Sequence, residues 1–152
     1  MTDKTLRRRD FLAIAGAGAL GFTMLPLPAA ATPADVMAVI GKAIGGKAPK
    51  EGRIEITLPE IAENGGVVPL KVVVESPMSD ADHVKRVHVF ADGNPLPDVA
   101  TYHFGPHNGK AEFSLRLRLA KSQKIVCVAE MSDGSVYMAG REIKVTLGGC
   151  GG

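Results

Sequence analysis

Residues 111–119 read Ala-Glu-Phe-Ser-Leu-Arg-Leu-Arg-Leu, and this stretch decides the fold class. Apolar and polar side chains alternate along it, with Phe113, Leu115, Leu117 and Leu119 on one face and Ser114, Arg116 and Arg118 on the other. Successive side chains of a β-strand point to opposite faces. The stretch therefore predicts a strand of an antiparallel sheet with one face in the core and the other in solvent.

Similar short stretches, bounded by turn residues, occur on both sides of this strand. We predict further strands at residues 53–58, 67–75, 84–91, 100–104, 124–131 and 136–147. Turns are expected at residues 64–66, 92–95 and 133–134, and Asn108-Gly109 predicts a hairpin. About seven short strands at intervals of about ten residues predict an all-β fold, an immunoglobulin-like antiparallel β-sandwich.

A short helix is predicted ahead of the strands. Thr32-Pro33-Ala34-Asp35 has the residues of a helix start, and Gly45-Gly46 is typical of a helix end. Between them the apolar residues fall at helical spacing: Val36, Val39, Ile40, Ala43 and Ile44. This apolar stripe must pack on another part of the protein.

Residues 1–31 have the pattern of a signal peptide rather than of a folded segment. Arg7-Arg8-Arg9 is followed by a short, glycine-rich apolar run and by small residues that end near Ala31. The paired arginines favour export by the twin-arginine route, which carries folded proteins, and hence a periplasmic location. The apolar run is too short for a membrane anchor. Export in the folded state is consistent with a partner subunit leaving on the same signal.

The charge of the mature chain is balanced. Residues 1–31 hold four of the 18 basic and two of the 16 acidic residues, which leaves 14 of each sign. The charge balance gives no indication of a nucleic-acid partner. The remaining 121 residues fit one domain, predicted at 32–147, followed by an arm at 148–152.

Two cysteines remain, and their surroundings differ. Cys127 lies in Ile125-Val126-Cys127-Val128-Ala129, where both faces are apolar, so we expect a structural core thiol. A disulfide with Cys150 is the usual state of an exported pair and stays open as an alternative.

Cys150 has two glycines on each side: Gly148, Gly149, Gly151 and Gly152. Glycine has the highest entropy cost of ordering, so this segment predicts a flexible arm. Three residues separate Leu147 from Cys150, which gives a reach of about 10 Å. No basic residue follows Lys144, so the thiol pKa is expected to stay near its free value of about 8.5.

A tethered thiol without a neighbouring base predicts a covalent carrier rather than an enzyme. Three alternatives were weighed: a surface thiol without function, an exported scaffold or adhesion module with an intermolecular disulfide, and a carrier that uses its terminal glycine carboxylate. The last requires ATP, which an exported protein does not meet.

The other candidate residues give no site. His88 alternates with Val87 and Val89 and is expected to face solvent, and His103 and His107 flank a turn. The spacing of the histidines, His83 included, predicts no metal site, and no cofactor motif is present.

The segment Thr146-Leu147-Gly148-Gly149-Cys150-Gly151-Gly152 resembles the C-terminal arm of the SoxY family, the sulfur-carrier subunits of the periplasmic thiosulfate-oxidising (Sox) complex. The export signal, the short helix and the strand-rich body match that family as well. The resemblance implies that Cys150 is the carrier residue, and it assigns no role to Cys127.

The resemblance also implies the partners. SoxZ, a related sandwich subunit, would bind this chain. A heme c enzyme would join thiosulfate oxidatively to Cys150, a hydrolase would release sulfate, and a sulfane dehydrogenase would act on the remaining sulfur. The interface with SoxZ cannot be assigned from the sequence.

Overall fold

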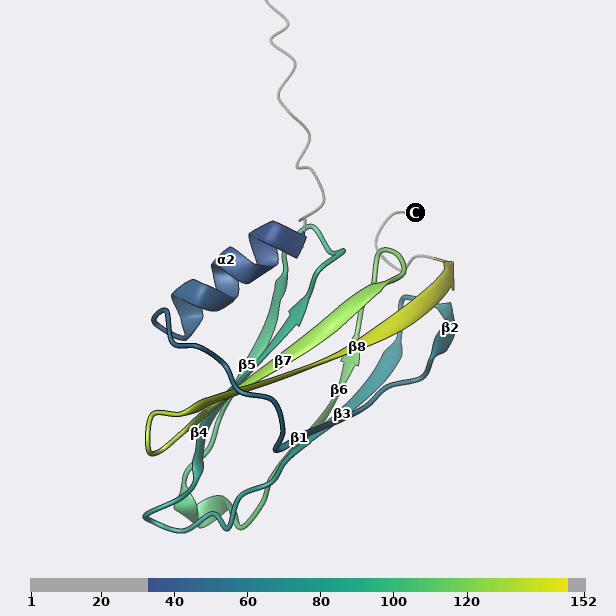
Figure 1. The fold of residues 1–152 in the computed structure, drawn as a ribbon. Coiled ribbons are helices and arrows are strands. Elements are labelled where there is room, and N and C mark those ends of the chain that lie inside the picture. Colours follow the sequence, from purple (N-terminus) through teal and green to yellow (C-terminus); the bar gives the residue numbers. More distant parts are fainter. Residues whose placement is uncertain (1–32, 148–152) are drawn as a thin grey trace, which may run out of the picture.

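The computed structural model describes residues 33–147, which form two packed β-sheets and one helix (Figure 1). The expected signal peptide at 1–31 and the expected arm at 148–152 lie outside the described residues. The elements, in chain order, are α2 (Pro33–Ala43), β1 (Ile54–Thr57), β2 (Ile61–Asn64), β3 (Val68–Val74), β4 (Val84–Ala91), β5 (Asp98–His103), the 3-10 helix η1 (Pro106–Asn108), β6 (Ala111–Leu117), β7 (Gln123–Met131) and β8 (Val136–Leu147). The prediction of an all-β sandwich is confirmed.

The smaller sheet has the strand order β1-β3-β6 and is antiparallel. Its strands alternate as the sequence predicts: in β6 Leu117 is buried and Phe113 and Leu115 are half-buried, while the residues between them are exposed. Leu115 pairs with Leu70 of β3, which is 1 % exposed. The inward face of this sheet thus supplies one half of the core.

The larger sheet has the order β2-β8-β7-β4-β5. Its inward side chains include Val89, Cys127 and Ile143, which pack against Leu70 and its neighbours in a single core cluster. Strands β4 and β7 are buried on both faces over most of their length. A sheet buried on both faces needs a second layer outside it.

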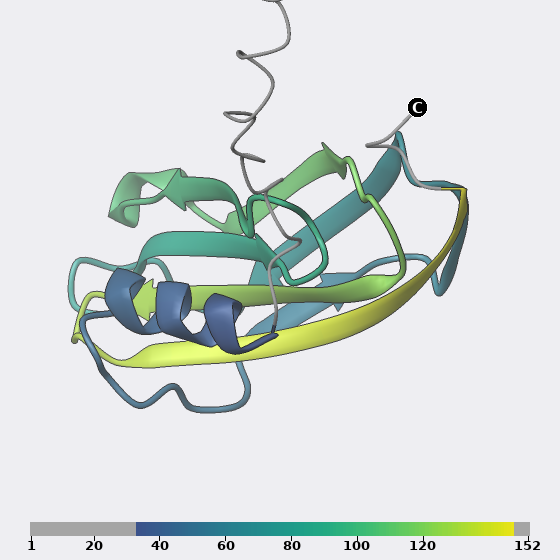
Figure 2. The same ribbon diagram turned by 90° about the horizontal axis from the view of Figure 1, so that it is seen from above.

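Helix α2 provides that layer (Figure 2). Val36, Ile40 and Ile44 of the predicted stripe pack on Val126 and Val128 of β7, and Phe90 and Val136 complete the cluster. The helix ends where the two glycines allow it: Gly45 and Gly46 have positive φ, and the Gly46 amide donates to the Gly41 carbonyl at 2.8 Å. The prediction that this stripe packs on the body is confirmed.

Two local predictions differ from the structure. Strand β2 was not predicted, and it pairs with β8 in parallel, with Asn64 beside Leu147. Asn108-Gly109 does not form a hairpin, because the strands on its two sides belong to different sheets: β5 pairs with β4, and β6 pairs with β3. Gly109 still adopts a positive φ of 66°. It turns the chain from one sheet to the other.

Candidate functional site

The expected carrier residue, Cys150, and its four glycines lie outside the described residues. What the structure gives is the point from which this segment starts, Leu147 at the end of β8. Figure 1 places this end beside β2, at the edge of the larger sheet. The site is therefore built from the surroundings of Leu147.

The end of β8 is fixed by backbone hydrogen bonds from two neighbouring segments. The Gly65 amide donates to the Leu147 carbonyl at 2.7 Å, and the Leu119 amide donates to the Gly65 carbonyl at 2.8 Å. The Val145 amide donates to Ser122 Oγ at 2.9 Å. The backbone is thus held up to the last described residue, although the Leu147 side chain is 68 % exposed. Sequence reasoning missed β2, the strand that makes this anchor, because four residues are too few for an alternating pattern to stand out.

Cys127 lies at the centre of the fold. It is 0 % exposed, on β7 between Val89 of β4 and Ala139 of β8, and it is a free thiol. Burial raises the pKa of this thiol to about 12. Because the thiolate is the nucleophilic form of cysteine, Cys127 is unreactive at neutral pH.

His88 does not face solvent, so that expectation is wrong. Its side chain is 9 % exposed; Nδ1 lies 2.9 Å from Thr101 Oγ1, and Nε2 lies 3.0 Å from Glu130 Oε1. Arg86 donates to the other oxygen of Glu130 at 2.8 Å. Burial by itself would raise the pKa of Glu130, but the hydrogen bonds from His88 and Arg86 outweigh it and hold the pKa below its ordinary value. The pattern missed this because Glu130 comes from β7, 42 residues away.

The remaining histidines lie apart from this group. His83 Nδ1 is 3.0 Å from the Ser79 carbonyl oxygen, and His103 and His107 are exposed. Within residues 33–147, no three His, Cys, Asp or Glu side chains are close enough to hold a metal ion. In the same part of the chain, no helix is long and apolar enough to cross a membrane.

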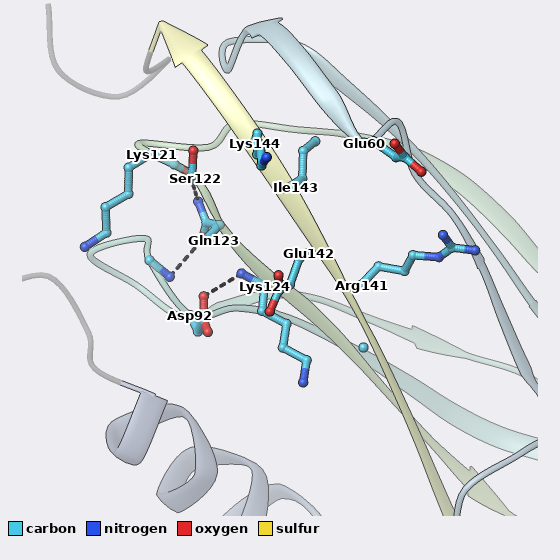
Figure 3. Close-up of a pocket in the computed structure, with 12 residues that line it drawn as sticks. Glu60, Asp92, Lys121, Ser122, Gln123, Lys124, Arg141, Glu142, Ile143 and Lys144 are labelled. Carbon is cyan, nitrogen blue, oxygen red and sulfur yellow. Dashed lines mark hydrogen bonds between the residues drawn. The ribbon is translucent and has the colours of Figure 1, made fainter.

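An open cavity of about 830 Å³ lies beside the end of β8 (Figure 3). Its lining is mostly charged or polar and comes from β7, β8 and two loops: Glu60, Asp92, Gly93, Lys121, Ser122, Gln123, Lys124, Gly140, Arg141, Glu142, Ile143 and Lys144. We call the part formed around Lys121, Lys124 and Lys144 the lysine groove. In Figure 3 Arg141 and Glu60 lie on the other side of β8 from Lys121 and Lys124.

The loop beneath the lysine groove is rigidly built. Gln123 is buried, and its side chain accepts from the Gly93 amide at 2.8 Å and donates to Asn94 Oδ1 at 3.0 Å. Asp92 Oδ1 accepts from the Lys124 amide at 2.8 Å. These hydrogen bonds join the 92–95 turn to the start of β7, so the backbone that carries Lys121 and Lys124 has a defined position.

The comparisons with known proteins point to one family. A sequence model of the family described as "Sulfur oxidation protein SoxY" matches residues 40–150, a segment that includes Cys150. The solved structure of the sulfur carrier protein SoxY from Chlorobium limicola f thiosulfatophilum is 35 % identical, with a TM-score of 0.64. The match covers 76 % of this chain and 100 % of that one. No curated protein sequence matches the chain.

A second group of structures shares only the fold. A superoxide reductase (neelaredoxin) from Ignicoccus hospitalis is 21 % identical, with a TM-score of 0.51, over 76 % of this chain and 94 % of that one. This similarity extends to the β-sandwich and gives no information about the site.

Proposed function

We infer that this chain, which belongs to the family of the sulfur oxidation protein SoxY, is a sulfur carrier that holds its cargo covalently on the thiol of Cys150. The family membership supports the carrier role in sulfur oxidation. The assignment to Cys150, the chemical form of the cargo and the partners are our proposal.

The burial of Cys127 is the observation that carries the assignment. The chain has two cysteines, and covalent loading requires a thiolate that a partner enzyme can reach. Cys127 is 0 % exposed, and its pKa is raised to about 12. Cys150 follows three residues after an exposed, hydrogen-bonded strand end and has no bulky neighbour on either side in sequence. Cys150 is therefore the thiol proposed to react.

The proposed cycle consists of two balanced steps. First, the Cys150 thiolate and thiosulfate form an S–S bond to give a cysteine S-thiosulfonate, and the two electrons released pass to a heme c enzyme. Next, water cleaves the bond between the outer sulfur and the sulfonate group, which releases sulfate and a proton and leaves a persulfide on Cys150. A sulfane dehydrogenase then oxidises the persulfide sulfur. The carrier supplies the thiol and the reach, and the partner enzymes supply the catalysis.

The location and the subunit partner complete the proposal. The twin-arginine pattern of residues 7–9 supports export to the periplasm, where a SoxZ subunit would bind this chain. In this role the chain is a covalent substrate of its partners rather than an enzyme, and it needs no cofactor of its own.

Intact-mass measurement tests the assignment. The mature chain with its partner subunit is exposed to thiosulfate and the thiosulfate-conjugating enzyme, and we expect a thiosulfonate adduct that peptide mapping places on Cys150. Cys150→Ser should abolish the adduct. Cys127→Ala is the matched control: it is expected to lower stability and to leave the adduct intact. An adduct on Cys127, or turnover by Cys150→Ser, would contradict the proposal, and a stable disulfide dimer as the working form would favour a scaffold.

A further inference from the structure

We propose that the lysine groove is the docking surface for an acidic face of the proteins that react with Cys150. This inference rests on the proposed carrier function and adds to it the place where a partner enzyme binds and the chemistry of that partner's surface. It is carried by the position of the groove, by its unpaired charges and by the glycines beneath its lysines.

The position follows from the length of chain on each side of Leu147. Lys144 precedes Leu147 by three residues, and Cys150 follows it by three. Each segment spans about 10 Å at most when extended. An enzyme whose active site receives Cys150 therefore covers the surface next to the end of β8. The lysine groove is the charged cavity on that surface (Figure 3).

The charges of the groove have no partners within the described residues 33–147. Lys121, Lys124 and Lys144 are exposed, and none of them forms an ion pair there, whereas Arg53, Lys71 and Arg86 pair with Asp82, Glu112 and Glu130.

The nearby carboxylates do not neutralise these lysines. Asp92 is engaged by the Lys124 backbone amide, and Glu142 makes no ion pair in the described part of the chain. Three cations that remain unpaired beside a strand end are complementary to an acidic surface.

Two glycines let the lysine side chains lie along the sheet. A Cβ at Gly140 would come 2.5 Å from Lys124 Cε, and a Cβ at Gly93 would come 3.0 Å from Lys121 Cε. The aliphatic stems thus pass over backbone that carries no side chain, and their ammonium groups face the open cavity. This arrangement positions the charges without burying them.

Such a surface suits short-lived complexes. Exposed charges increase the association rate by about 10- to 1000-fold but contribute little to the lifetime of a complex. A carrier that visits several enzymes needs fast association and fast release. A protein partner is favoured over a small anion because the three amines line an open cavity of about 830 Å³ rather than a closed anion pocket.

The test measures how fast the thiosulfate-conjugating enzyme loads the mature full-length chain in complex with its partner subunit. Loading is followed by intact mass at low and at high ionic strength. The variant Lys121→Glu, Lys124→Glu, Lys144→Glu should load at least tenfold more slowly at low salt. The milder variant with glutamine at the same three positions should lie between it and the wild type, and it guards against a folding defect.

A matched control reverses three exposed lysines elsewhere: Lys42→Glu, Lys85→Glu and Lys110→Glu. We expect this control to load within twofold of the wild type. Alkylation of Cys150 by iodoacetamide should proceed at the same rate in all variants, which shows that the thiol itself is unchanged. Raising the salt concentration should slow the wild type and leave the reversed variant almost unaffected.

The outcomes separate this inference from the proposed function. If the reversed variant loads as fast as the wild type, the docking inference is wrong and the carrier function stands. If sodium sulfate slows the wild type far more than sodium chloride of equal ionic strength, the groove binds a sulfur oxyanion and the inference is wrong as well. If no variant, the wild type included, acquires an adduct on Cys150, the carrier assignment fails and the docking inference fails with it.

Discussion

The two ends of strands β7 and β8 present opposite surfaces on the outer face of the larger sheet. At one end Val126, Val128 and Val136 are buried beneath α2. At the other end Lys124 and Lys144, on the same strands, are exposed in the lysine groove. The helix covers only the first end (Figure 2). The comparison indicates that one end of the face stabilises the fold, while the other is free to bind a partner next to Cys150.

The largest expected effect comes from breaking the covered end. Ile40→Ala removes a side chain that is 2 % exposed and leaves a cavity beneath α2, so it should lower the free energy of unfolding by about 2–5 kcal/mol. Met37→Ala is the matched control on the same helix, because Met37 is 56 % exposed, and it should cost less than about 0.5 kcal/mol. Urea denaturation measures both. Equal losses for the two variants would mean that α2 does not pack as described.

A smaller effect is expected from the polar group on the same face. Glu130→Gln removes the carboxylate that Arg86 and His88 share, and it should cost about 1–2 kcal/mol at neutral pH. Thr101→Val removes the hydroxyl at the other ring nitrogen of His88, and we expect a smaller loss because no charge is lost. If Glu130→Gln proves as stable as the wild type, the buried group contributes nothing to the fold.

The pH dependence of this effect has a definite sign. The pKa of Glu130 is lower in the folded protein than its ordinary value of 4.5. The carboxylate therefore stabilises the fold above pH 4.5, and this contribution is lost as the pH falls through the folded pKa. Unfolding curves between pH 7 and pH 3 should show that the difference between wild type and Glu130→Gln shrinks below about pH 4.5. A difference that grows on acidification would contradict the assignment.

The smallest effects sharpen the comparison at the level of single glycines. Gly41→Ala lies within α2 with nothing within 4 Å of the added Cβ, and it should stabilise the protein by about 0.5–1 kcal/mol. Gly140→Ala lies beneath Lys124 and should change stability by less than about 0.5 kcal/mol, because only a flexible side chain has to move. Thermal unfolding tests both. A large loss for Gly140→Ala would mean that the open end is packed more tightly than its exposure indicates.

The sequence predicted those parts of the fold that depend on near neighbours. The alternation in residues 111–119 and the stripe from Val36 to Ile44 each predict an element and its inward face, and the structure confirms both. It also favoured a buried position for Cys127, because both faces of its segment are apolar, and the structure places that thiol in the core. The prediction that Cys150 is the carrier residue comes from the sequence alone, because residues 148–152 lie outside the described part.

The tertiary structure decided which distant segments meet. It placed β2 in parallel beside the end of β8, put β5 and β6 in different sheets despite Asn108-Gly109, and buried His88 against Glu130. It also left one end of the outer face uncovered, which made the lysine groove. Periodicity records which side of a strand or helix is apolar, since that depends on residues two to four positions apart. Pairing partners and coverage depend on residues tens of positions apart, and no local pattern contains them.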